Sequence, residues 1–236
     1  IKYQTATSLT HTSLTTNTKY NYKVRAYRMV GTTRVFGAYS TVSSSTPLPM
    51  PPVISVASAG YNSLNVSWPA VAGASGYEVS YSYNASGPFT VLPLTTKTST
   101  VVPNLSTNVA VFVRVRTYRT VSYVKRYGNY SAVVSGVAIP SAPVLALSSN
   151  GYDSINVGWA AVAGASGYEV YVLDGEYRLL SDTAALNVVD GGKVTGMETT
   201  YKVRAYRWVN SVKVFGPESI GKTRAVPSLP DRKSVV

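Results

Sequence analysis

Few residues in this chain have the types and spacing that catalysis requires. The chain has one histidine, His11, and no cysteine, so it offers no thiol nucleophile and no cysteine-based zinc cluster. Carboxylates that hydrolyse a glycosidic bond must lie within about 5–10 Å of each other. Glu78 and Glu169 occupy the same position in two repeated segments, so one site cannot hold both. We therefore expect no enzyme activity, no catalytic residue and no cofactor.

Loops that could bind a metal ion or a phosphate group are also scarce. The segment Asp174-Gly175-Glu176 could be read as a calcium loop, but a tight hairpin turn explains its Asp-Gly pair better. The sequence contains no glycine-rich loop with a phosphate-binding pattern. It therefore predicts no metal site.

Basic residues and tyrosines recur in one short motif, which is the best candidate for a binding surface. Residues 22–28 read YKVRAYR, residues 201–207 repeat this heptapeptide, and residues 113–119 read VRVRTYR. Alternate side chains of a β-strand point to the same face, so each copy would present two cations and a tyrosine away from the core. The members of these outward stripes are Lys23, Arg25, Tyr27, Arg114, Arg116, Tyr118, Lys202, Arg204 and Tyr206.

The outward stripes have two competing interpretations. In the structural one, Arg114 or Arg116 pairs across the sheet with Glu78. Arg204 pairs with Glu169 in the same way, the aromatic rings add cation–π contacts, and each exposed pair contributes about 0–1 kcal/mol. In the functional one, the stripes bind cell-wall polyanions, sulfated glycans or nucleic acid with a salt-dependent affinity. Repetition in every copy favours the structural interpretation, since repeats inherit the chemistry of their strands.

The charge of the chain is unevenly distributed. The 22 basic and 10 acidic residues give a net charge of +12. Residues 1–150 hold twelve of the basic residues and one acid, or +11, whereas the rest hold ten and nine, or +1. This asymmetry suggests that the first part could meet an anionic polymer. Nucleic acid is not the expected partner, because the sequence contains neither a recognition module nor a run of clustered Lys and Arg.

The elements that must position these residues are the strands of a tandem repeat. Residues 60–79 read GYNSLNVSWPAVAGASGYEV and return at 151–170 with four differences in twenty positions. A copy this close, at a period near 90 residues, indicates a tandem array. Within each copy, apolar and polar residues alternate on both sides of a small, turn-prone segment, which is typical of two half-buried strands. The aromatic residues expected in the cores are Trp68, Tyr77, Trp159 and Tyr168.

Several short strands per ninety residues, with turn signals between them, predict an all-β fold of antiparallel β-sandwiches. The tryptophan of the second strand, the Tyr-x-Val after Gly76 and Gly167, and the Tyr-x-Val-x-Ala of the penultimate strand resemble tandem fibronectin type III domains of the bacterial extracellular or cell-surface type. This resemblance covers nearly the whole chain and implies immunoglobulin-like sandwiches. Of the family's tyrosine corners, only the one at Tyr20 is matched. The resemblance says little about function, since this fold hosts many roles.

The repeat predicts four parts of the chain. Residues 1–48 match only the C-terminal strands of a module, residues 49–139 and 140–229 are complete modules, and residues 230–236 form a tail. We refer to these parts as the first segment, the second module, the third module and the tail. Proline-rich linkers between them favour stiff, extended connections. The front of the first module has either been removed or is supplied by a neighbouring chain through β-strand addition.

These observations predict a non-catalytic, extracellular or cell-surface spacer array within a surface protein, an appendage or a secreted multidomain protein. Its partners would be other domains of the same polypeptide. The first alternative is an adhesive module that binds anionic polysaccharide or cell-wall polymer through the outward stripes. The second is a fibre subunit that self-associates when a neighbouring chain completes the first module. No segment reaches eighteen uninterrupted apolar residues, so we expect no membrane span.

Overall fold

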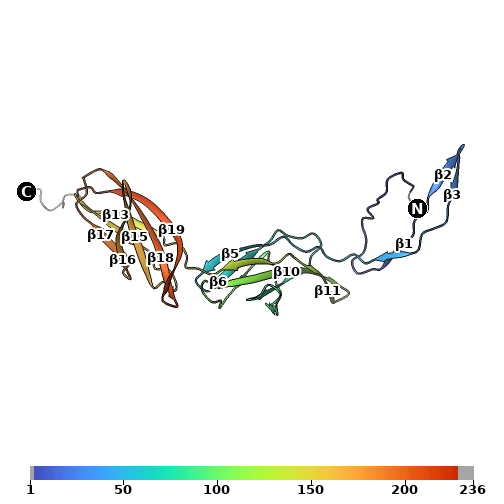
Figure 1. The fold of residues 1–236 in the computed structure, drawn as a ribbon, viewed down its shortest axis with the longest axis horizontal. Coiled ribbons are helices and arrows are strands. Elements are labelled where there is room, and N and C mark those ends of the chain that lie inside the picture. The colour runs from blue at the N-terminus through green and yellow to red at the C-terminus, as the bar shows by residue number, and fades with distance from the viewer. Residues whose placement is uncertain (1–2, 228–236) are drawn as a thin grey trace, which may run out of the picture.

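The computed structural model describes residues 3–227, which form β-strands and no α-helix. Figure 1 shows two complete sandwiches following one another along an elongated chain, with the first segment extending from one end. The all-β class and the tandem of antiparallel sandwiches, with an incomplete first module, are as the sequence predicts. Residues 228–230 of the last linker and the expected tail at 230–236 lie outside the described residues.

The second module consists of two antiparallel sheets. One has the strand order β5-β6-β9, and the other has the order β11-β10-β7-β8, with β12 also paired to β10. The strands are β5 (Ser55–Gly60), β6 (Ser63–Ser67), β7 (Gly76–Ser82), β8 (Thr90–Val91), β9 (Ser99–Val102), β10 (Ala110–Val121), β11 (Val124–Tyr130) and β12 (Val134–Val137).

The third module repeats this arrangement with longer outer strands. Its sheets have the orders β13-β14-β17 and β16-β15-β18-β19. The expected hairpin turn at Gly175, which has a φ of +69°, joins two of these strands and is confirmed. The strands are β13 (Leu145–Gly151), β14 (Ser154–Trp159), β15 (Gly167–Asp174), β16 (Glu176–Thr183), β17 (Asn187–Asp190), β18 (Glu198–Val209) and β19 (Val212–Arg224).

Each core is built around the repeated tryptophan. Trp68 and Tyr77 are buried with their ring centroids 5.1 Å apart, and Trp159 and Tyr168 are buried at 5.2 Å. The hydroxyl of Tyr77 accepts a hydrogen bond from the backbone N–H of Val71 at 2.9 Å, and the equivalent bond at Tyr168 measures 2.8 Å. The four aromatic residues expected in the cores therefore lie there, and each tyrosine also ties the turn-prone segment to its core.

The first segment has no covering sheet among the described residues. Val24 is 72% exposed, whereas Val115 and Val203, at the same repeat position, are fully buried. The hydroxyl of Tyr20 accepts a hydrogen bond from the backbone N–H of Thr15 at 3.0 Å. The strands form two antiparallel pairs, β1 (Tyr20–Tyr22) with β4 (Ser43–Ser45) and β2 (Tyr27–Val30) with β3 (Thr33–Phe36).

Candidate binding face

The outward stripes of the two complete modules lie on the sheet that contains β10 in the second module and on the sheet that contains β18 in the third, on the face opposite the core. In β10, Arg114 and Arg116 alternate with the buried Val113 and Val115, as strand geometry requires. The same alternation places Lys202 and Arg204 of β18 on the outer face of the third module. In the first segment, Lys23 and Arg25 lie between β1 and β2, and Tyr27 begins β2.

A buried glutamate anchors the stripe of the second module. Arg116 donates from Nε and Nη2 to the two carboxylate oxygens of Glu78, at 2.9 and 3.1 Å, and Tyr130 donates its hydroxyl at 2.7 Å. Burial alone would raise the pKa of Glu78, but these hydrogen bonds and the charges of Arg116 and Arg114 outweigh burial and hold the pKa below its usual value. The structural interpretation of Arg116 is therefore confirmed.

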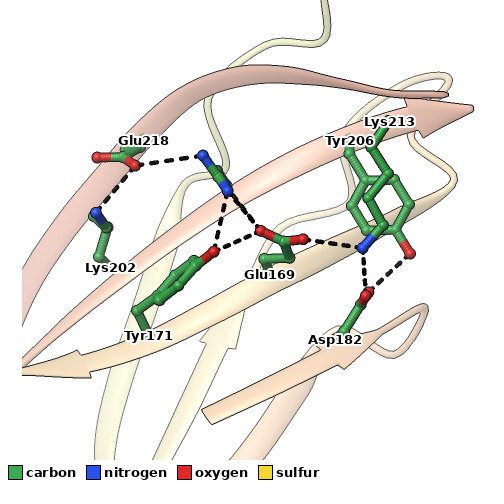
Figure 2. A network of polar contacts seen from close by, with 8 residues as sticks. Glu169, Tyr171, Asp182, Lys202, Tyr206, Lys213 and Glu218 are labelled. Carbon is green, nitrogen blue, oxygen red and sulfur yellow. Dashed lines mark hydrogen bonds and ion pairs between the residues drawn. The ribbon is translucent and has the colours of Figure 1, made fainter. Parts of the chain in front are cut away.

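Glu169 is the centre of a larger network in the third module, shown in Figure 2. Arg204 donates from Nε and Nη2 to Glu169 Oε2 at 3.1 and 2.7 Å, and the hydroxyl of Tyr171 donates to the same oxygen at 2.6 Å. Lys213 donates to Glu169 Oε1 at 2.9 Å. Burial alone would raise the pKa of Glu169, but the hydrogen bonds from these three partners outweigh burial and lower the pKa to about 2. The expected pair of Arg204 and Glu169 is confirmed.

The network of the third module includes residues that the sequence reasoning missed. Lys213 also pairs with Asp182, which accepts a hydrogen bond from the hydroxyl of Tyr206 at 2.9 Å. Glu218 forms an ion pair with Lys202 at 3.1 Å. Lys202, Arg204 and Lys213 therefore all have carboxylate partners inside their own module (Figure 2).

The tyrosines of the stripes lie on the expected face but are not exposed. Tyr118 and Tyr206 pair with Gly76 and Gly167 and lie outside both core clusters, yet each is only 7% exposed. The physical reason is a glycine on the neighbouring strand, because a Cβ added at Gly76 or Gly167 would overlap the tyrosine hydroxyl. Since these glycines have no side chain, each tyrosine ring lies across the next strand and is covered there. Tyr27 instead packs against aromatic rings of the first segment.

Arg114 differs from the other stripe cations of the complete modules because it forms no ion pair among residues 3–227. Its guanidinium carbon lies 3.9 Å from the ring centroids of both Phe89 and Tyr130. Its Nε also donates to the hydroxyl oxygen of Ser80 at 3.3 Å. The positive charge of Arg114 is therefore held between two aromatic rings without an ion-pair partner among these residues.

The cations of the first segment resemble Arg114 in this respect. Lys23 lies over the ring of Tyr39 at 4.1 Å, and Arg25 lies over Phe36 at 3.8 Å. Residues 1–48 contain no aspartate or glutamate. Stripe cations without a carboxylate partner therefore occur in the first segment and at Arg114, and the third module has none among its described residues.

The single histidine lies in the first segment. His11 lies 3.0 Å from the hydroxyl of Tyr22 and packs edge-on against two tyrosine rings. Within residues 3–227 no three metal-binding side chains gather at one point. The same residues include no helix of the length and apolarity needed to cross a bilayer.

The topology and the paired outer faces define a tandem of fibronectin type III-like β-sandwiches. No family model matches the sequence, and no curated protein matches it. Among solved structures, the chain is similar to a segment of two fibronectin type III domains from chicken tenascin, with 15% identity, a TM-score of 0.40, and coverage of 74% of this chain and 99% of that one. It is also similar to the FN1–FN3 domains of chicken CNTN1, with 15% identity, a TM-score of 0.38, and coverage of 90% and 79%.

Proposed function

We propose that this chain is a non-catalytic spacer within a larger secreted or cell-surface protein, where it holds other domains of the same polypeptide apart. The observation that carries this proposal is that most stripe cations of the complete modules are neutralised within their own module. Arg116, Lys202 and Arg204 each pair with a carboxylate. A face whose charges stabilise its own sheet suits a structural element better than a binding site.

The experiment combines small-angle X-ray scattering with a binding and turnover screen. A spacer should scatter as an elongated particle whose maximum dimension does not change with added polysaccharide. Calorimetry at physiological ionic strength should give no saturable binding of sulfated glycan or anionic cell-wall polymer. Saturable binding under these conditions, or hydrolysis of any polysaccharide by the chain, would reject the spacer function.

Binding of an anionic glycan is the second candidate function, and Arg114 is the observation that favours it. A guanidinium between Phe89 and Tyr130 has a fixed position and no competing carboxylate of its own. A sulfate or carboxylate group of a sugar polymer could meet this charge while the sugar ring packs on one of these half-buried rings. Lys23 and Arg25 of the first segment would offer further cations that lie over aromatic rings.

Lys202 provides a matched control for Arg114, because it occupies the same repeat position but pairs with Glu218. If the second candidate holds, Arg114→Ala should weaken binding of a sulfated glycan about five- to thirtyfold at low salt, as loss of one charge-assisted contact implies. Lys202→Ala should leave the affinity unchanged. Equal effects of the two substitutions would indicate that net charge alone attracts the glycan. If neither substitution changed the affinity, the outward stripes would be excluded as the glycan-binding surface.

Assembly into a fibre is the third candidate, favoured by the open face of the first segment. A cleft there is lined by apolar and basic side chains that include Tyr3, Leu9 and Val24. In the complete modules, the corresponding face is covered by a second sheet. If the chain forms a fibre, sedimentation should show assemblies larger than the monomer. Limited proteolysis of these assemblies should leave residues 3–48 uncut. A monomeric mass with a protease-sensitive first segment would count against this function.

A further inference from the structure

One aromatic contact joins the second module to the third. Tyr61 lies in the turn between β5 and β6, at the end of the second module. The guanidinium carbon of Arg207 in β18 lies 4.6 Å from the centroid of the Tyr61 ring. A Cβ added at Gly164 would overlap the ring atoms, so the ring rests directly on the backbone there. Arg207 also donates from Nη1 to the carbonyl oxygen of Gly164 at 2.8 Å. Gly164 and Arg207 thus form a seat for the ring of Tyr61.

The repeat supplies an internal comparison, because every part of this contact has a copy. Tyr152 is the copy of Tyr61, and Gly73 and Arg119 are the copies of the seat. Tyr152 is 64% exposed, and no aromatic or cation–π partner of its ring occurs among residues 3–227. Gly73 and Arg119 are also exposed, whereas Tyr61 and both residues of its seat are half-buried. The burial of Tyr61 is therefore a property of the junction and not of the repeat.

The covalent connection at this junction is very short. The backbone N–H and carbonyl of Ile139 both bond to the hydroxyl of Ser58 at 3.0 Å, which fixes Ile139 to the second module. The next residue, Pro140, packs on the third module, because its carbonyl oxygen occupies the place that a Cβ of Gly216 would need. Rotation of one module against the other is thus concentrated near the peptide bond between Ile139 and Pro140. Tyr61 opposes that rotation, because its ring contacts the third module at a second point.

We propose that Tyr61, Gly164 and Arg207 form an inter-module latch that holds the second and third modules in one orientation. A cation over an aromatic ring favours a contact by about two- to thirtyfold. This is too weak to join two separate molecules. Because the linker already holds the two modules end to end, the contact is intramolecular, and a factor of this size acts directly on the equilibrium between their relative orientations. The latch would stiffen the junction whatever ligand the chain binds or lacks.

The absence of native cysteine allows two spin labels to be placed cleanly. Lys97→Cys in the second module and Ala184→Cys in the third are exposed sites, and neither residue belongs to the latch. Double electron–electron resonance should give one narrow distance distribution for the labelled chain. Tyr61→Ala should broaden it at least twofold, and Tyr61→Phe, which keeps the ring, should preserve it. Tyr152→Ala is the matched control and should have no effect.

A second pair of variants tests the seat. Gly164→Ala and Gly73→Ala impose the same backbone strain, since the two glycines have φ values of +70° and +75°. Only Gly164→Ala also pushes a methyl group into the Tyr61 ring, so only this variant should broaden the distribution. A distribution that stays narrow in Tyr61→Ala, or one that is already broad in the parent chain, overturns the latch. Circular dichroism of each variant shows that both sandwiches remain folded.

Discussion

Tyr130 and Tyr171 lie on different strands of their modules, yet each donates its hydroxyl to the glutamate at the same repeat position. Tyr130 of β11 reaches Glu78 at 2.7 Å, and Tyr171 of β15 reaches Glu169 at 2.6 Å. The third module has Glu218 at the position of Tyr130, so the two copies place their tyrosine donors differently. A buried carboxylate without enough donors is costly, which explains why the donor is present in both copies although its strand differs.

The pKa of Glu169 predicts that the third module loses stability in acid. A carboxyl group whose folded pKa is lowered from 4.5 to about 2 contributes stability above the unfolded value, and this contribution is lost as the pH falls toward the folded value. The free energy of unfolding should therefore fall by up to about 3 kcal/mol from this group between pH values of about 4.5 and 2. Urea unfolding at a series of pH values measures it.

Glu169→Gln should make the third module less stable at neutral pH and should flatten this acid dependence. The exposed Glu176 supplies the control, since Glu176→Gln should follow the parent chain at every pH. An acid dependence that is equally steep in Glu169→Gln and in the parent chain would show that other groups cause it.

Trp68→Ala should destabilise the second module by about 3–5 kcal/mol, because it leaves a large cavity beside Tyr77. A loss of this size is enough to unfold a marginally stable sandwich. Chemical denaturation followed by circular dichroism measures the change. Trp208, which is 50% exposed, provides the control, and its replacement by alanine should cost much less. A loss below about 1 kcal/mol for Trp68→Ala would contradict its role in the core.

Gly167→Ala should destabilise the third module by about 1–3 kcal/mol, because the added methyl group would collide with the hydroxyl end of Tyr206. Gly191→Ala is the matched control. An added Cβ at Gly191 would have no heavy atom within 4 Å, so its effect should stay within about 0.5 kcal/mol. Thermal unfolding compares the two variants, and equal stabilities would show that the Tyr206 ring moves aside freely.

The repeat made the fold predictable from sequence. Because Trp68 and Trp159 recur in nearly identical surroundings, alternation of apolar residues was enough to place both in cores and to identify the flanking strands. The same alternation predicted a pair of Arg114 or Arg116 with Glu78 and a pair of Arg204 with Glu169, and the register of the strands places Arg116 and Arg204 directly opposite these glutamates. Long, repeated patterns of this kind leave little choice of register.

The rest of the candidate site depends on contacts that no repeat pattern encodes. Lys213 and Asp182 lie on β19 and β16, strands that are separated in the sheet by two others, so their pairing depends on side-chain length and sheet twist. The burial of Tyr206 follows from a glycine on the adjacent strand. The contact of Tyr61 with Arg207 depends on how the two modules are placed relative to each other. Its only sign in the sequence was that Tyr61, Gly164 and Arg207 each have a counterpart of the same residue type in the other module.

The unequal neutralisation of charge along the chain has a mechanical consequence. The first 150 residues carry +11 and the remainder +1, and the chain is elongated (Figure 1). In the field of an anionic surface, which decays over about 10 Å at physiological salt, such a rod experiences a torque as well as an attraction. Near such a surface the N-terminal end would be drawn toward it and the third module would be left in solution.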